Sequence, residues 1–80
     1  MTLSVLLFAS YADAFGRDRL EVTMRPGATV SELVRQVVLL SKGAVLPPAP
    51  AVAVNHRHAG YDRVIAPGDE VAIIPPVAGG

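Results

Sequence analysis

One segment of this chain has the apolar periodicity of an amphipathic helix, and short runs that favour strands lie on both sides of it. The segment, RPGATVSELVRQVVLLSKG, opens with a Pro-Gly turn and a Thr29-x-x-Glu32 capping box. Its apolar residues then recur at intervals of three and four until Gly43. We therefore predict one helix of about three to four turns inside one small domain.

The runs that flank this helix predict strands. Residues 3–8 are continuously β-favouring, and residues 20–25 alternate apolar with polar, so the two suit a hairpin through SYADAFGRDR. The stretch VLPPAP is expected to be a stiff, irregular connector, because closely spaced prolines remove backbone donors. AVAVN then reads as a buried strand, HRHAGYD as a turn or hairpin tip, and APGD as a tight turn before the strand EVAII.

The order strand-strand-helix-strand-strand is that of the β-grasp, or ubiquitin-like, fold. We expect an α+β domain over residues 1–74, with a mixed sheet and one main helix packed on one face, and a flexible tail over residues 75–80. Because alternate strand positions share a face, the expected core joins strand residues to helix residues. The expected members are Leu3, Val5, Leu7, Val71 and Ile73 from the strands, and Val30, Leu33, Val34 and Val37 from the helix.

Composition and charge exclude several classes of protein. A hydrophobic fraction of 51% against 18% charged residues is enough for a core and argues against intrinsic disorder. Seven basic and seven acidic residues cancel, so no net field favours nucleic acid or an anionic membrane. Without cysteine there is no disulfide, thiolate metal site or cysteine nucleophile, which fits the cytoplasm. No apolar run approaches the ~20 residues of a membrane span.

The opening LSVLLFASYADAFG loosely imitates a secretory signal, because an apolar run is followed by Ala12-Asp13-Ala14. No Lys or Arg occurs before Arg17, however, and a positively charged start is a defining part of that signal. We therefore expect the segment to be a buried first strand of a cytoplasmic protein.

Other chemically capable residues give weaker signals. His56, His58 and Asp62 could ligate zinc only if the tip stays extended, and the expectation is a solvated turn without metal. Four charged residues of the expected first hairpin are predicted to be solvated: Arg17, Asp18, Arg19 and Glu21. The sequence has no phosphate-binding glycine loop and no motif that would activate a serine.

The last eight residues, IIPPVAGG, place two prolines before a terminal pair of glycines. Prolines fix φ and stop a strand from continuing, whereas glycines lack the side chains that would block a narrow channel. The segment is therefore expected to leave the sheet stiffly and then to become a flexible tail. The alternative is a frayed terminus.

The stretch APGDEVAIIPPVAGG resembles the C-terminus of the small subunit of molybdopterin synthase, a ubiquitin-like sulfur carrier of the MoaD/ThiS family. The resemblance covers essentially the whole chain, since LSVLLFASYADAFG, the VAVN strand and the length also fit. Two features depart from the family pattern. Ile73 and Ile74 stand where members often carry aromatic residues, and the NHRHAG tip is longer and more basic than usual.

The resemblance implies a protein that carries sulfur and is not catalytic by itself. An E1-like activating enzyme would use ATP to adenylate Gly80, and a sulfurtransferase-derived persulfide would convert it to a thiocarboxylate. The tail would then enter the large synthase subunit and supply sulfur for the dithiolene of molybdopterin, in molybdenum cofactor biosynthesis. Gly80 would be the reacting residue, and the residues that thread into the partner would be Pro75, Pro76, Val77, Ala78 and Gly79. No cofactor would be bound by the carrier itself.

Strand alternation also predicts a docking surface. Leu6, Phe8 and Ile74 are expected on the sheet face opposite the helix, as an apolar patch for the large subunit. Three other functions remain open at this point: a sulfur carrier for thiamine or tRNA thiolation, a ubiquitin-like modifier of lysines, and a β-grasp interaction module with a coincidental tail.

Overall fold

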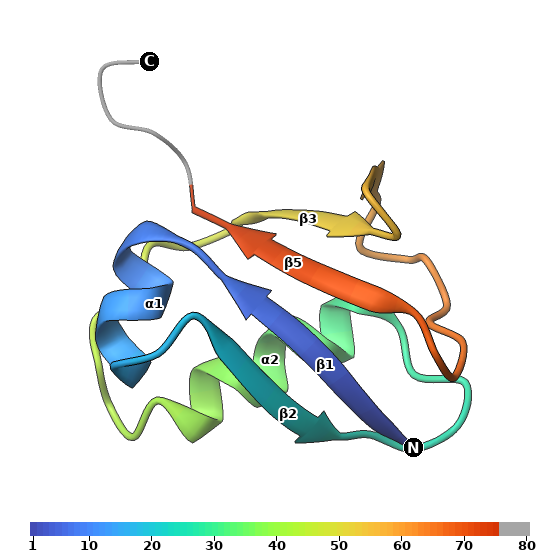
Figure 1. The fold of residues 1–80 in the computed structure, drawn as a ribbon, viewed down its shortest axis with the longest axis horizontal. Helices are drawn as coiled ribbons and strands as arrows, with labels where there is room; N and C mark the ends of the chain where they lie inside the picture. The colour runs from blue at the N-terminus through green and yellow to red at the C-terminus, as the bar shows by residue number, and fades with distance from the viewer. Residues whose placement is uncertain (76–80) are drawn as a thin grey trace.

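The computed structural model describes residues 1–75 of the chain (Figure 1). The elements in chain order are β1 (Thr2–Leu7), α1 (Ala9–Phe15), β2 (Arg19–Thr23), α2 (Val30–Leu40), β3 (Ala51–Val54), β4 (Arg57–Ala59) and β5 (Glu70–Ile74). This order contains the predicted strands and main helix, together with α1 and β4, which the sequence analysis did not assign.

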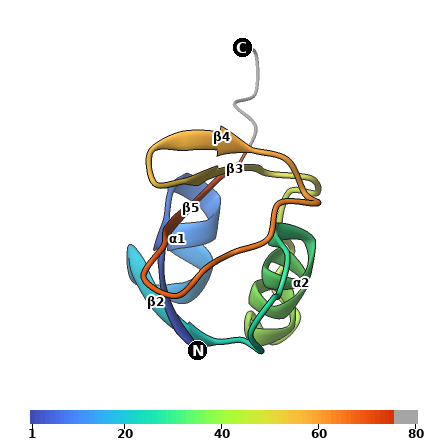
Figure 2. The ribbon, with the colours of Figure 1, turned by 90° about the vertical axis from the view of Figure 1, so that its right-hand side faces the viewer.

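The strands form one mixed sheet in the order β2-β1-β5-β3-β4. β1 and β5 are parallel, whereas the pairs β1–β2, β3–β5 and β3–β4 are antiparallel. A view turned by 90° shows α2 standing on one side of this sheet (Figure 2). The β-grasp fold with its main helix on one face is therefore confirmed.

The core lies between α2 and the inner face of the sheet. Alternate residues of β1 and β5 are buried, which is the period-two pattern expected of strands with one covered face. The predicted core is confirmed: eight of its nine members are at most 2% exposed, namely Leu3, Val5, Leu7, Val30, Leu33, Val37, Val71 and Ile73. The ninth, Val34, is partly buried and packs against them.

The connection between β1 and β2 corrects the sequence analysis. β1 and β2 do pair as antiparallel neighbours, but residues 9–15 form helix α1 instead of a hairpin loop. Tyr11 on α1 is buried, and Gly16 ends the helix with a positive φ of 67° while its N–H bonds to the carbonyls of Ala12 and Asp13. The apolar pair Tyr11 and Phe15, four residues apart and followed by glycine, is the signal of a short helix in this sequence.

Helix α2 begins as the sequence predicted. Thr29 is its N-cap, and the Thr29 hydroxyl accepts a hydrogen bond from the Glu32 backbone N–H at 3.3 Å. In a complete capping box the Glu32 carboxylate would accept a hydrogen bond from the Thr29 backbone N–H. Here it accepts a 2.6 Å hydrogen bond from the Arg25 guanidinium instead. The acidic side chain thus ties the start of α2 to the end of the β2 segment.

The predicted tip HRHAGYD is shorter than expected. The turn itself contains Asn55 and His56, whose φ angles of 53° and 70° are the left-handed pair required by a tight two-residue hairpin. The chain then returns as β4, with Ala53 opposite His58. The predicted tight turn at APGD is present, since the Asp69 N–H bonds to the Ala66 carbonyl at 3.1 Å.

The proline-rich connector between α2 and β3 has no regular structure, as predicted. Two tyrosines hold it: the Tyr11 hydroxyl donates to the Pro47 carbonyl at 2.7 Å, and the Tyr61 hydroxyl donates to the Pro50 carbonyl at 2.6 Å. Burial raises the pKa of the Tyr11 hydroxyl, and the nearby Tyr61 raises it further. Burial also raises the pKa of Tyr61.

The inner face of β5 gives the first testable prediction. Ile73→Ala should lower the free energy of unfolding by about 2–5 kcal/mol, because it leaves a cavity in a core where Ile73 is fully buried. Its neighbour Ile74 is 39% exposed on the other face, so Ile74→Ala is a matched control with a much smaller loss. Urea denaturation of both variants measures the difference. Equal losses would contradict the assignment of Ile73 to the core face.

The two connector tyrosines give a prediction about alkaline pH. Their pKa values are raised from 10.0 in the folded protein, so the folded state favours the neutral hydroxyls. This contribution to stability is complete below pH 10 and is lost as pH rises through the folded pKa values. Denaturation between pH ~8 and pH ~11 should show the loss.

A Tyr11→Phe/Tyr61→Phe double variant provides the control for other alkaline titrations. It should lose about 0.5–1.5 kcal/mol per hydrogen bond at neutral pH. It should also destabilise less steeply than the parent between pH ~9 and pH ~11, since it lacks both hydroxyls. Identical slopes for parent and variant would show that the connector bonds do not contribute.

Candidate functional site

The strand that leads into the predicted tail is held at the centre of the sheet. β5 pairs with β1 on one side and with β3 on the other, so both of its edges are hydrogen-bonded. Ala51 is opposite Ile74, which places Pro50 and Pro75 next in register. Both prolines are buried, and neither has an N–H to extend the ladder. The β3–β5 pairing therefore ends at a fixed point.

The predicted tail residues are divided by the limit of the described structure. Pro75, expected as the first of them, is buried directly after β5. The remaining ones, Pro76, Val77, Ala78, Gly79 and Gly80, lie outside the described residues. Their proposed roles in threading and reaction stay predictions.

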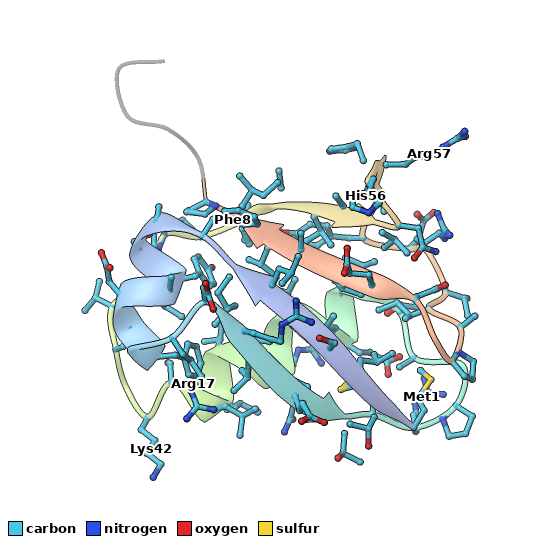
Figure 3. The ribbon with its side chains drawn as sticks, in the orientation of Figure 1. Met1, Phe8, Arg17, Lys42, His56 and Arg57 are labelled. Carbon is cyan, nitrogen blue, oxygen red and sulfur yellow. The ribbon has the colours of Figure 1, made fainter. Side chains whose placement is uncertain are left out.

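The outer face of the sheet carries apolar side chains near the end of β5. Leu6 is opposite Ala72, and Ala72 is opposite Ala53, so these three residues cross the neighbouring strands β1, β5 and β3. Phe8 and Ile74 extend the surface with exposed fractions of 47% and 39%, and Figure 3 shows Phe8 beside the end of β5. We call this set the outer-face patch: Leu6, Phe8, Ala53, Ala72 and Ile74.

The three patch residues named from sequence lie as the alternation predicted. Leu6 is half-buried, whereas Phe8 and Ile74 are exposed. Leu6 and Ile74 occupy strand positions alternate to the core residues, and Phe8 directly follows β1 as the N-cap of α1. The two alanines were missed, although the same period-two reading of AVAV and EVAII places them on this face.

The other end of the outer face is polar. Ser4 is opposite Glu21 on one side and Glu70 on the other, and the Ser4 hydroxyl accepts a 2.9 Å hydrogen bond from Arg19. The four charged residues expected to be solvated are all exposed: Arg17, Asp18, Arg19 and Glu21. On the outer face of the sheet, the apolar side chains therefore lie toward the end at which β5 finishes.

A polar network ties the β3–β4 turn to the start of β5. The Asn55 side-chain amide donates to the Asp69 carboxylate at 2.9 Å, and its carbonyl accepts from the Glu70 N–H at 3.0 Å. The Asp69 carboxylate also accepts from the Ala66 N–H at 2.8 Å. This backbone hydrogen bond, followed by that from Asn55, lowers the pKa of Asp69. Ionised Asp69 thus fixes the register at which β5 begins.

The histidines of this turn do not form a metal site with Asp62. His56 lies in the turn at positive φ and its Nε2 is 3.4 Å from the Glu70 carboxylate, while His58 lies in β4 opposite Ala53. Within residues 1–75, no group of three or more metal-ligating side chains is close enough to hold an ion. No helix of this region has the length and apolar character to cross a membrane.

The model of the ThiS family matches residues 5–80. The structure of SAMP1 from Haloferax volcanii is similar over all of both chains, with 27% identity and a TM-score of 0.81. A putative molybdopterin converting factor, subunit 1, from Pyrococcus furiosus has 26% identity and a TM-score of 0.76, covering 96% of this chain and 99% of that one.

A chain of the complex between subunits 1 and 2 of molybdopterin-converting factor from Helicobacter pylori has the same fold. It is 19% identical, with a TM-score of 0.62 over all of both chains. The family match spans nearly the entire sequence and agrees with the β-grasp topology and the resemblance of the C-terminal segment. The chain belongs to the ThiS family of ubiquitin-like sulfur carriers.

Proposed function

We propose that this protein is the small, sulfur-carrying subunit of a molybdopterin synthase. The observation that carries the choice of pathway is the similarity, over 96% of the chain, to the Pyrococcus furiosus protein described as a putative molybdopterin converting factor, subunit 1. The IIPPVAGG ending supplies the chemistry, because Gly80 offers an unhindered carboxylate. The proposal requires Gly80 to end the mature chain.

The carboxylate needs activation before it can accept sulfur. In the proposed sequence, the Gly80 carboxylate attacks the α-phosphate of ATP on an E1-like enzyme and releases pyrophosphate. The terminal sulfur of a sulfurtransferase-derived persulfide then attacks the acyl carbon, and AMP departs. A thiol cleaves the remaining sulfur–sulfur bond, which leaves the thiocarboxylate. The carrier supplies the substrate terminus, and its partners supply the catalytic groups.

The domain contributes a rigid base for this terminus. Pro75 is buried at the end of the central strand, so the five residues that follow extend from a fixed position. Fully extended, they span at most roughly 17 Å. Such a short tether keeps the sulfur at a high effective concentration in the large-subunit site and limits competition from water. Two sulfurs per dithiolene would require two loaded carriers.

The large subunit is the proposed partner of the outer-face patch. The Helicobacter pylori structure contains subunits 1 and 2 of molybdopterin-converting factor in complex, and one of its chains shares this fold. The outer-face patch is apolar, lies next to the base of the tail and has exposed Phe8 and Ile74. A partner seated there would receive the tail directly.

A second candidate function is protein modification. The similarity to SAMP1, whose name from a second Haloferax volcanii structure is small archaeal modifier protein 1, favours it at 26–27% identity. Both functions begin with adenylation of Gly80. They differ in the acceptor, meaning the group that attacks the adenylated carboxyl carbon: a persulfide sulfur in one case and a lysine amine in the other. Carriers for thiamine or tRNA thiolation share the thiocarboxylate, and their products distinguish them.

Intact mass measurement separates these functions. The purified chain is incubated with ATP, an E1-like enzyme and a persulfide donor, with and without a molybdopterin synthase large subunit. We expect the mass of the chain to increase by the difference between one sulfur and one oxygen. This increase should disappear when the large subunit and the molybdopterin precursor are added, because the sulfur is then transferred. Covalent adducts on lysines without any thiocarboxylate would support the modifier function instead.

The terminus gives a direct prediction. Deleting Gly80, or adding one residue after it, should abolish thiocarboxylate formation and molybdopterin synthesis, because the reacting carboxyl is then absent or misplaced. Gly79→Val keeps the carboxylate but adds a β-branched side chain, so it should reduce activity if the tail enters a narrow channel. Mass spectrometry and synthase assays measure these effects.

Thermal unfolding provides the control for the terminal variants. Their melting temperatures should match that of the parent, since the core closes within residues 1–75. Full activity of the Gly80 deletion would rule out the sulfur-carrier mechanism and leave the interaction module.

The outer-face patch gives a separate prediction. Ile74→Asp should weaken binding to the large subunit by roughly tenfold or more, because a carboxylate would be desolvated in an apolar interface. Thr23→Asp places the same charge at an exposed position of β2 away from the patch and should bind normally. Titration calorimetry measures both. If Ile74→Asp binds as tightly as Thr23→Asp, the large subunit docks elsewhere.

A further inference from the structure

The second exposed apolar surface lies on α2, away from the outer face of the sheet. Three consecutive residues of its last turn, Val38, Leu39 and Leu40, are 41%, 68% and 39% exposed. Val45 in the following connector is 98% exposed. We call these four residues the α2 patch. None of them is needed by the core, and large apolar side chains gathered on a surface mark a site of interaction.

Hollows lie on both sides of this helix end. On one side, a groove of about 440 Å³ is lined by Val34 and Val38 of α2, by Tyr11 and by the connector from Ala44 to Pro50. Its lining contains no charged residue. On the other side, Leu39 and Arg35 border a hollow of about 310 Å³ that reaches Met24 and is also lined by the ion pair of Arg25 and Glu32. The α2 patch therefore lies between two hollows, and a partner can insert apolar side chains into them.

Two cations, Arg35 and Lys42, border the patch. Arg35 precedes Val38 and Leu39 on α2, and Lys42 follows the helix end, where Figure 3 shows it pointing away from the fold. Within the described residues neither forms an ion pair, whereas Arg25 is paired with Glu32. From Leu33 to Tyr61 the sequence contains no aspartate or glutamate. A protein segment that covers this patch therefore meets free cations at its rim.

This charge pattern selects among the possible occupants. A second copy of the chain would bring Arg35 and Lys42 to both sides of a symmetric interface, where like charges repel. A basic partner would meet the same penalty. A segment with apolar residues on one side and carboxylates at its margins satisfies both the hollows and the cations.

We propose that the α2 patch is a docking surface for an acidic amphipathic segment of a partner protein. Its apolar side chains enter the groove beside Val38, and its carboxylates pair with Arg35 and Lys42. Figure 2 shows α2 on the side of the sheet opposite the outer face. A protein bound at the α2 patch thus leaves the outer-face patch free, and this docking does not depend on the acceptor of Gly80.

Amide NMR titration of the full chain with three synthetic helical peptides of equal length tests the proposal. The first has leucines on one face and glutamates on the other, the second has lysines in place of the glutamates, and the third has serines in place of the leucines. We expect the leucine–glutamate peptide to shift amides of residues 35–46, with an affinity that falls as salt rises. The other two peptides should bind at least roughly tenfold more weakly.

Variants of the chain make the test specific. Leu39→Asp should weaken binding of the leucine–glutamate peptide by roughly tenfold or more, whereas Val64→Asp, at a residue 57% exposed outside both patches, should not. An Arg35→Glu/Lys42→Glu variant should prefer the leucine–lysine peptide. All four positions are exposed, and circular dichroism verifies folding.

Three outcomes would overturn the proposal. The first is equal binding of the glutamate and lysine peptides, and the second is shifts confined to the outer face. The third is a concentration-dependent dimer in sedimentation that Leu39→Asp dissociates, which would identify a second copy as the occupant.

Discussion

The pairing of β5 between β1 and β3 is the constraint on which the structure depends. The parallel ladder with β1 and the antiparallel ladder with β3 together fix which face each β5 residue presents. One set, Val71 and Ile73, completes the core under α2, and the alternate set, Ala72 and Ile74, completes the outer-face patch. A slip of one residue would exchange the two sets. The same strand thus closes the core and positions the exposed residues of the outer-face patch.

The end of β5 is equally determined by its neighbours. Pro50 and Pro75 follow the last pair of the β3–β5 ladder, and the Pro50 carbonyl accepts the Tyr61 hydroxyl. The connector before β3 is also tied to α1 through Tyr11 and Pro47. Because these contacts join segments far apart in the chain, the position at which β5 ends is set by the folded domain. A carrier needs such a fixed base if a short terminus is to reach a partner's site reproducibly.

The sequence predicted the parts of the fold that repeat a local pattern. Alternation placed Leu3, Val5 and Ile73 in the core and Ile74 outside it, and the capping box located the start of α2. Helix α1 was missed because its seven residues provide less than two turns of periodicity. It also lacks a polar N-cap, since Phe8 occupies that position directly after β1. The bonds of Tyr11 and Tyr61 to the connector could not be predicted, since they depend on tertiary contacts 36 and 11 residues apart.

The candidate site shows the same division between local and long-range information. The IIPPVAGG segment can be recognised from the sequence alone, and under the proposed function its unhindered Gly80 carboxylate suits activation whatever the acceptor. The acceptor must be chosen by surfaces that bring one partner to the tail and keep others away. The outer-face patch lies beside Pro75, whereas the α2 patch lies on the opposite side of the sheet and is bordered by Arg35 and Lys42. The domain therefore presents two separate apolar surfaces, one beside the end of β5 and one on α2, so that under the two proposals one partner could bind at each surface at the same time.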